Sequence, residues 1–141
     1  MCFLGRLDLK IRFMNEEEFI KKTRENFTGK SILGRPVNPD ALAYTLLGEN
    51  EYKKDNYEGA IEWYSKSINI DSANHYNFTQ RGKSYMFLKV YDKALTDLFL
   101  SQKLDDNFPN NQAIAECYLF KQEHNVAIKY FNIALDKMTD S

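Results

Sequence analysis

ALAYTLLGENEYKKDNYEGAIEWYSKSINI, residues 41–70, decides the fold of this chain of 141 residues. Apolar residues recur at the spacing of one helix face over 41–54 and again over 57–70, with a polar Asp-Asn pair between the two runs. The stretch therefore predicts two amphipathic helices joined by a tight turn.

Small residues show that this helix pair is repeated. In each copy two small residues stand twelve positions apart, and the set recurs after 34 and then 33 residues: Gly48 and Ala60, Gly82 and Ala94, Ala115 and Ala127. One helix pair cannot bury its apolar face alone, so a period of this length predicts stacked pairs that share a core. The small residues are expected where two helices cross closely, because larger ones would hold the backbones apart.

These residues resemble the tetratricopeptide repeat (TPR) family, whose pattern is an aromatic residue, Leu-Gly, Tyr, Ala, a second aromatic residue and Ala at set offsets. The matching residues are Tyr44, Leu47-Gly48, Tyr52, Ala60, Tyr64 and Ser67, then Phe78, Arg81-Gly82, Tyr85, Ala94, Leu98 and Ser101, then Ile114-Ala115, Tyr118, Ala127, Phe131 and Ala134. The family's closing proline is absent, with Ser72 and Asp106 in its place. The resemblance implies an all-α fold, a right-handed superhelix of three TPR helix-turn-helix repeats at 41–74, 75–107 and 108–141, with a leading N-terminal helix.

Outside the first repeat stretch, the pattern predicts helices at 75–88, 91–104, 110–121 and 124–137. Residues 15–40 are expected to form the leading helix and a linker. Asn15 and Glu18 have capping-box spacing, so the helix should run from Asn15 to about Asn26. Two glycines and two prolines mark 28–40 as linker or loop, in which Asn38 or Asp40 would cap the first repeat helix.

The first fourteen residues are expected to be disordered, although Leu7, Leu9, Ile11 and Phe13 alternate with polar residues as in a strand. A lone strand beside helices has nothing to pair with. Two alternatives stay open, namely a natural start at Met14 and a strand that pairs outside the chain.

Composition excludes several classes of protein. The 19 basic and 20 acidic residues give a formal charge of −1, without the basic surplus typical of nucleic-acid or anionic-membrane binding. No apolar run approaches the roughly 18 residues of a membrane span. Two cysteines and an opening without a secretory signal favour a reducing cytoplasm.

No candidate residues for chemistry stand at the required spacing. TGKS at 28–31 lacks the first glycine of a phosphate-binding loop, since position 24 is arginine. His75 and His124 stand alone, and Cys117 falls on the core side of a predicted helix. We therefore expect no enzyme activity, no metal and no cofactor.

By resemblance, the first helix of each repeat lines a concave groove for a peptide. The groove-facing residues expected to bind it are Glu49, Tyr52, Tyr76, Thr79, Lys83, Met86, Phe87, Glu116, Leu119 and Phe120. Most are apolar or aromatic, and such side chains make good binding anchors. Part of this set is expected to fill the core between helices instead.

The same positions argue against one kind of ligand. Relatives that grip acidic chaperone tails use a clamp of Lys, Asn and Arg. Its positions hold Thr45, Glu49, Gln80, Pro109 and Ala113 here. We therefore expect an adaptor or scaffold that binds an apolar peptide segment of a protein partner.

A narrower resemblance, carried by Ala115–Leu119 within FPNNQAIAECYL at 108–119, is to TPR chaperones of bacterial type III secretion translocators. It implies an alternative function, that of a cytoplasmic chaperone for a secreted or membrane-destined client.

The last helix carries apolar residues with no later helix to cover them in this sequence, among them Ile128, Phe131 and Leu135. Exposed apolar patches are often interaction sites. We expect this helix to mediate self-association or to dock a partner.

Overall fold

The computed structural model describes residues 14–27, 31–32, 35–107 and 109–139. Its chain divides into two compact units, residues 1–72 and 73–141. The first unit holds α2 (Glu16–Phe27), β1 (Ser31–Ile32), β2 (Arg35–Pro36), α3 (Pro39–Lys53) and α4 (Tyr57–Ile70). The second holds α5 (His75–Phe87), α6 (Tyr91–Leu104), α7 (Asn111–Phe120) and α8 (His124–Thr139).

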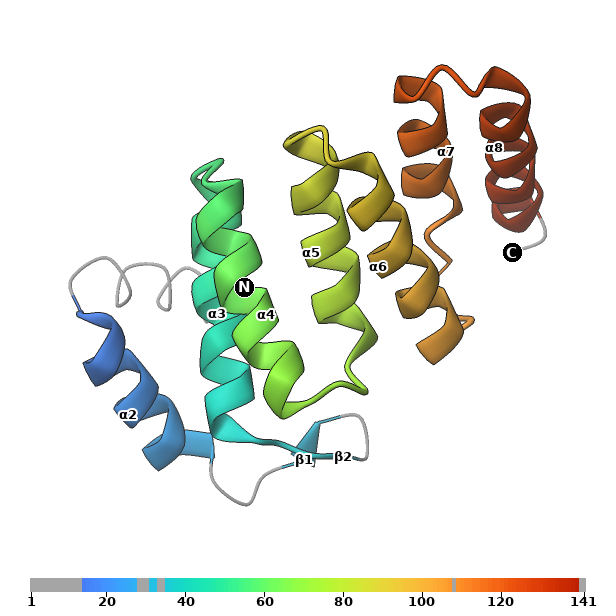
Figure 1. Cartoon of the computed structure of the whole chain (residues 1–141). Helices are drawn as coiled ribbons and strands as arrows, with labels where there is room; N and C mark the ends of the chain where they lie inside the picture. The colour runs from blue at the N-terminus through green and yellow to red at the C-terminus, as the bar shows by residue number, and fades with distance from the viewer. Residues whose placement is uncertain (1–13, 28–30, 33–34, 108, 140–141) are drawn as a thin grey trace. The chain divides into compact units, whose positions relative to one another are not determined.

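Each predicted helix pair is present as an antiparallel hairpin, α3 with α4, α5 with α6 and α7 with α8 (Figure 1). The all-α fold class is therefore confirmed. Helix α3 begins two residues earlier than predicted because Pro39 suits the first turn of a helix, where no backbone N–H is needed. Of the two predicted capping candidates, Asn38 caps the helix: its side chain accepts hydrogen bonds from the backbone N–H groups of Asp40 and Ala41.

The leading helix also forms as predicted. The Asn15 side chain accepts a hydrogen bond of 2.8 Å from the backbone N–H of Glu18. Phe19 is buried against Ala43 and Leu47, so α2 covers one side of α3. The possible strand at 7–13 lies outside the described residues.

The linker differs from the expected plain loop. Residues 31–32 and 35–36 form a short antiparallel pair, with Ser31 opposite Pro36 and Ile32 opposite Arg35. Two residues per strand produce no alternating pattern long enough to detect in a sequence.

The turn inside each helix pair has the same backbone. Asp55, Lys89 and Gln122 have φ of 60°, 63° and 65°, in the left-handed region that non-glycine residues rarely adopt. They are 34 and 33 residues apart, as the small residues are. The three helix pairs therefore share one turn conformation at equivalent positions.

The close helix approach predicted at the small residues is present at Gly82, and Gly48 is packed as tightly. At Gly82 an added Cβ would lie 3.0 Å from the Leu98 side chain and 3.2 Å from the Ala94 carbonyl oxygen. At Gly48 the three nearest atoms belong to the ring of Tyr64, at 2.8–3.1 Å, rather than to Ala60. In the first pair the Tyr64 ring packs directly on Gly48.

The second helix pair contains an ion pair, Arg81 with Asp97, at positions where the other two pairs have apolar or aromatic residues. Arg81 donates two hydrogen bonds, of 2.7 and 2.9 Å, to the carboxylate of Asp97. The equivalent positions hold Leu47 and Trp63 in the first pair, and Ile114 and Tyr130 in the third. This ion pair links α5 to α6 at a place where the repeat pattern calls for apolar contact.

Candidate functional site

In the second unit, the predicted binding residues of α5 form one stripe along the helix. Tyr76, Lys83 and Phe87 lie seven and four residues apart, which places them on one face. Tyr76 and Phe87 are exposed and Lys83 is half-buried. Two large aromatic side chains at the surface, with a cation between them, are suited to contact a peptide.

Glu116 continues this stripe on α7. It stands 33 residues after Lys83 and so occupies the same position in the next helix pair. Its carboxylate accepts a hydrogen bond of 3.0 Å from the Gln112 side chain. The two first helices of the unit therefore carry opposite charges at equivalent places.

Three predicted residues make contacts within the fold. Met86 is buried in the core cluster with Leu98 and Ile114, so its predicted place in the groove is wrong. Thr79 bonds to the Ser101 hydroxyl at 2.6 Å. Phe120 is exposed, but its ring stacks on Tyr91 of α6 at a centroid distance of 5.8 Å.

In the first unit, the predicted residues Glu49 and Tyr52 are half-buried on α3. The ring of Tyr52 packs edge-on against Tyr57 at 5.5 Å, and burial raises the pKa of its hydroxyl. Tyr52 therefore supports the turn between α3 and α4 as well as facing solvent.

Two positions of the acidic-tail clamp are closed by the fold. The Thr45 hydroxyl is buried and lies 2.9 Å from the Ser67 hydroxyl, while Ala113 is buried in the second unit's core. Neither residue offers a cation or an amide to a carboxylate.

Cys117 lies in the core, as predicted from its place on the helix. Burial raises the pKa of its thiol to about 11, so the reactive thiolate is scarce at neutral pH.

Over the described ranges, no group of three or more His, Cys, Asp and Glu residues could hold a metal ion. None of the described helices is long and apolar enough to cross a membrane.

In each of the first two helix pairs, a pair of bonded hydroxyl groups links the two helices of that pair. The sequence analysis did not predict these bonds. Ser67 bonds to Thr45 and donates to the Ala41 carbonyl oxygen at 2.8 Å, and Thr79 bonds to Ser101 at the equivalent place. The recurrence of Thr and Ser at these offsets was the available signal.

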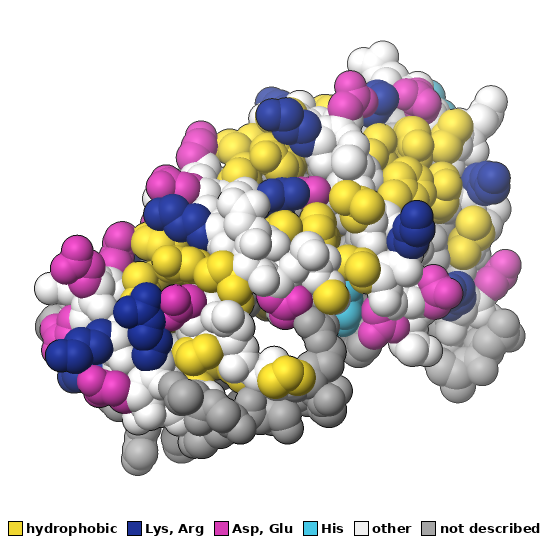
Figure 2. All heavy atoms as spheres, turned by 60° about the horizontal axis from the view of Figure 1, so that its bottom comes forward, with side chains coloured by type: hydrophobic (Ala, Val, Ile, Leu, Met, Phe, Trp, Pro, Cys, Tyr) yellow, Lys and Arg dark blue, Asp and Glu magenta, His cyan; other side chains and the backbone are white. Residues whose placement is uncertain are grey.

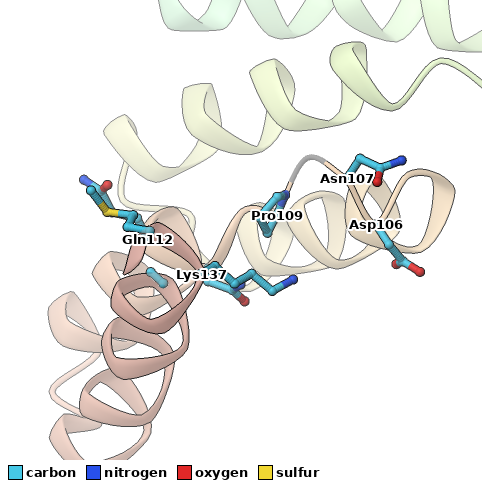
Figure 3. Close-up of a pocket in the computed structure, with 8 residues that line it drawn as sticks. Asp106, Asn107, Pro109, Gln112 and Lys137 are labelled. Atoms are coloured by element: carbon cyan, nitrogen blue, oxygen red, sulfur yellow. The ribbon is translucent and has the colours of Figure 1, made fainter. Parts of the chain in front are cut away.

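The third pair has no such bond, because its equivalent residues are Gln112 and Ala134. A cavity of about 560 Å³ lies there instead, and Figure 3 shows its labelled side chains around the start of α7 and the end of α8. It is lined by Asp106, Asn107, Pro109, Asn111, Gln112, Ala134, Lys137 and Met138.

Ser67→Ala is expected to lower the free energy of unfolding by about 1–3 kcal/mol, because it removes a buried bond and leaves polar partners behind. The control is Thr96→Ala, whose exposed hydroxyl bonds only within its own helix, to the Asp92 carbonyl oxygen at 2.9 Å. Its effect should stay within about 0.5 kcal/mol. Urea unfolding followed by circular dichroism measures both, and equal losses would contradict the role given to Ser67.

Comparison with known proteins agrees with this geometry. A model of the tetratricopeptide repeat family matches residues 41–74. The matched residues are those of the first predicted repeat. It is 25% identical over 121 residues to human tetratricopeptide repeat protein 12, covering 86% of this chain but only 16% of that relative.

Several solved structures are also similar to this chain. The second TPR domain of Spaghetti (RPAP3), bound to the HSP90 peptide SRMEEVD, is 26% identical, with a TM-score of 0.64 over 67% of this chain and 89% of that one. Two MamA structures show the same fold at 20% and 21% identity. Their TM-scores are 0.70 and 0.68, over 97% and 95% of this chain and 77% and 70% of theirs.

Proposed function

We propose that this protein is an adaptor or scaffold that binds an apolar peptide segment of a protein partner along α5 and α7. The observation that carries the proposal is the stripe of Tyr76, Lys83 and Phe87, in which both aromatic side chains are exposed. Aromatic anchors of this kind dominate binding energy at protein interfaces. Lys83 and Glu116 would set the direction of the peptide by contacting its charged groups.

The peptide-bound Spaghetti domain supports a peptide ligand for this chain, although not the same ligand. SRMEEVD ends in acidic groups. At the clamp positions this chain has a buried Thr45, a carboxylate at Glu49 and a buried Ala113. At these clamp positions an acidic tail would therefore meet the Glu49 carboxylate and no cation, whereas an apolar segment would contact Tyr76 and Phe87.

Selection from a displayed peptide library, followed by fluorescence anisotropy on the selected peptides, tests the proposal. Selected peptides should carry apolar or aromatic anchors and should bind at least roughly tenfold more tightly than SRMEEVD. Phe87→Ala should weaken them by about tenfold or more, as expected for an anchor residue. Leu100→Ala, at an exposed apolar residue of α6, is the matched control and should leave binding unchanged.

Peptides that are acidic, or that bind Phe87→Ala as tightly as the original chain, would contradict the proposal. The secretion-chaperone alternative gains no support from the proteins named above. It would require that the chain keep an apolar client in solution when the two are co-expressed. Cytoplasmic location, the absence of nucleic-acid and membrane binding, and self-association through the last helix stay predictions.

A further inference from the structure

The surface of α5 carries four side chains in line, with an aromatic ring at each end and two polar groups between them. Tyr76, Gln80, Lys83 and Phe87 follow one another at intervals of four, three and four residues, the spacing of one helix face. Tyr76 and Phe87 are 39% and 50% exposed, and Gln80 and Lys83 are half-buried. We call these four residues the α5 stripe.

The two polar side chains of the α5 stripe have unused hydrogen-bond donors. Gln80 accepts a bond of 2.8 Å from Ser84 through its backbone oxygen. Within the described part of the chain, neither the Gln80 amide nor the Lys83 ammonium group has a hydrogen-bond or ion-pair partner. Residues three apart on a helix are surface neighbours, so both groups can reach one acceptor. A carboxylate suits them because it accepts several hydrogen bonds, and those from a charged donor are strong.

Helix α7 limits the ligand to one such charge. The residues 33 positions after Gln80 and Lys83 are Ala113 and Glu116. Ala113 is buried, and the Glu116 carboxylate already accepts a bond of 3.0 Å from Gln112. A second acidic group placed over α7 would be repelled by Glu116, because unpaired like charges oppose binding.

The surface charge of the molecule is mixed. Basic, acidic and hydrophobic side chains are interspersed over the face shown in Figure 2. On such a surface a carboxylate is recognised by particular donors, because no broad excess of positive charge attracts it.

The length of the α5 stripe sets the spacing of the ligand's side chains. Tyr76 and Phe87 are eleven residues apart, which is roughly 16 Å along a helix, and Gln80 and Lys83 are centred midway between them. In an extended segment every second side chain points to the same face, and each residue adds about 3.3 Å. An acidic residue with an apolar residue two positions away on each side therefore spans about 13 Å. The long aromatic side chains at the two ends can lean inward over that distance.

We propose that the α5 stripe binds an extended segment of a partner protein in which one acidic residue stands between two apolar residues, each two positions away. Its carboxylate accepts hydrogen bonds from Lys83 and Gln80, and its apolar side chains contact Tyr76 and Phe87. The proposal rests on the peptide site proposed above and adds the conformation, the spacing and the single carboxylate of the ligand.

A helical ligand fits this stripe less well. Its apolar side chains would have to stand about eleven residues apart to reach both aromatic rings. The backbone carbonyl groups in the middle of a helix are already hydrogen-bonded, whereas an extended segment can also offer a carbonyl oxygen to the Gln80 amide.

The test compares labelled, amidated peptides of one length against the whole chain by fluorescence anisotropy. KFSESFS has the proposed spacing and no net charge, KFSQSFS lacks the carboxylate, and KFFSSSE has the first peptide's composition in another order. KFSESFS should bind roughly fivefold or more tightly than either of the others. Lys83→Met, which keeps the apolar stem, should abolish the preference for KFSESFS over KFSQSFS. Lys103→Met, at an exposed lysine of α6, is the matched control and should leave the preference unchanged.

Equal binding of KFSESFS and KFSQSFS would overturn the proposal, and so would equal binding of KFFSSSE. A preference that persists in Lys83→Met, with circular dichroism showing an intact helical chain, would overturn it as well. If Phe87→Ala weakens peptides that show no preference for the carboxylate, the peptide site stands and only this inference fails. If neither these peptides nor any from the displayed library bind, both proposals fail.

Discussion

Arg81→Ile is expected to lower the free energy of unfolding by about 3–5 kcal/mol, because it leaves a buried carboxylate without its partner. The side chain of Asp97 is only 4% exposed, and its carboxylate accepts two hydrogen bonds from Arg81. The same hydrogen bonding raises the pKa of Arg81, so the guanidinium stays charged at neutral pH. Urea unfolding by circular dichroism measures the loss.

The third helix pair suggests a second substitution that should restore the stability lost in Arg81→Ile. Arg81→Ile with Asp97→Tyr installs the residues found at Ile114 and Tyr130 in the third pair. Replacing a buried ion pair by packed apolar residues is often neutral or stabilising, so the double variant should recover most of the loss. Asp92→Ala is the control. It breaks a 2.8 Å bond to Lys121, but Asp92 is 87% exposed, so the cost should stay below about 1 kcal/mol. If the double variant is as unstable as Arg81→Ile, the pair does more than replace apolar contact.

Tyr64→Ala is expected to cost about 3–5 kcal/mol, as removal of a fully buried aromatic ring usually does. The ring has no exposed surface and fills the crossing of α3 and α4 at Gly48. Tyr57→Ala, at a half-exposed tyrosine of the same helix, is the matched control and should cost clearly less. Guanidinium unfolding compares the two variants, and similar midpoints would show that the crossing is not packed as described.

Gly48→Ala tests the same crossing from the other side. The added Cβ would lie 2.8 Å from the Tyr64 ring, so overpacking should cost about 1–3 kcal/mol. Tyr64→Leu in the same chain reproduces the residue at Leu98 and should relieve part of that cost.

Most of the fold could be predicted from the sequence, because a helix pair is specified locally and the specification recurs. Each helix was located to within about two residues. The signals were small residues such as Gly82 and Ala94, the polar turns, and the capping residues Asn15 and Asn38. The buried charge pair of Arg81 and Asp97 was not predicted. Two residues sixteen positions apart on different helices show their contact only when the helices are packed.

The candidate site was less predictable, because exposure depends on neighbours that a repeat pattern does not reveal. Tyr76, Lys83 and Glu116 lie at the surface or half-buried where helical spacing placed them, and their binding role stays a prediction. Met86, at the position of Leu119, was assigned to the groove on the same spacing and is a core residue instead.

The sequence alone predicted the helix pairs, their period and their turns. These features depend on hydrogen bonds and side-chain contacts between residues within a few tens of positions of each other. Only the packed molecule decided which members of the pattern are buried. Met86 and Leu119 are equivalent by sequence, yet one is 8% and the other 43% exposed, because α7 lies over the first and no described helix lies over the second. Burial depends on which helices surround a residue as well as on its place in the repeat.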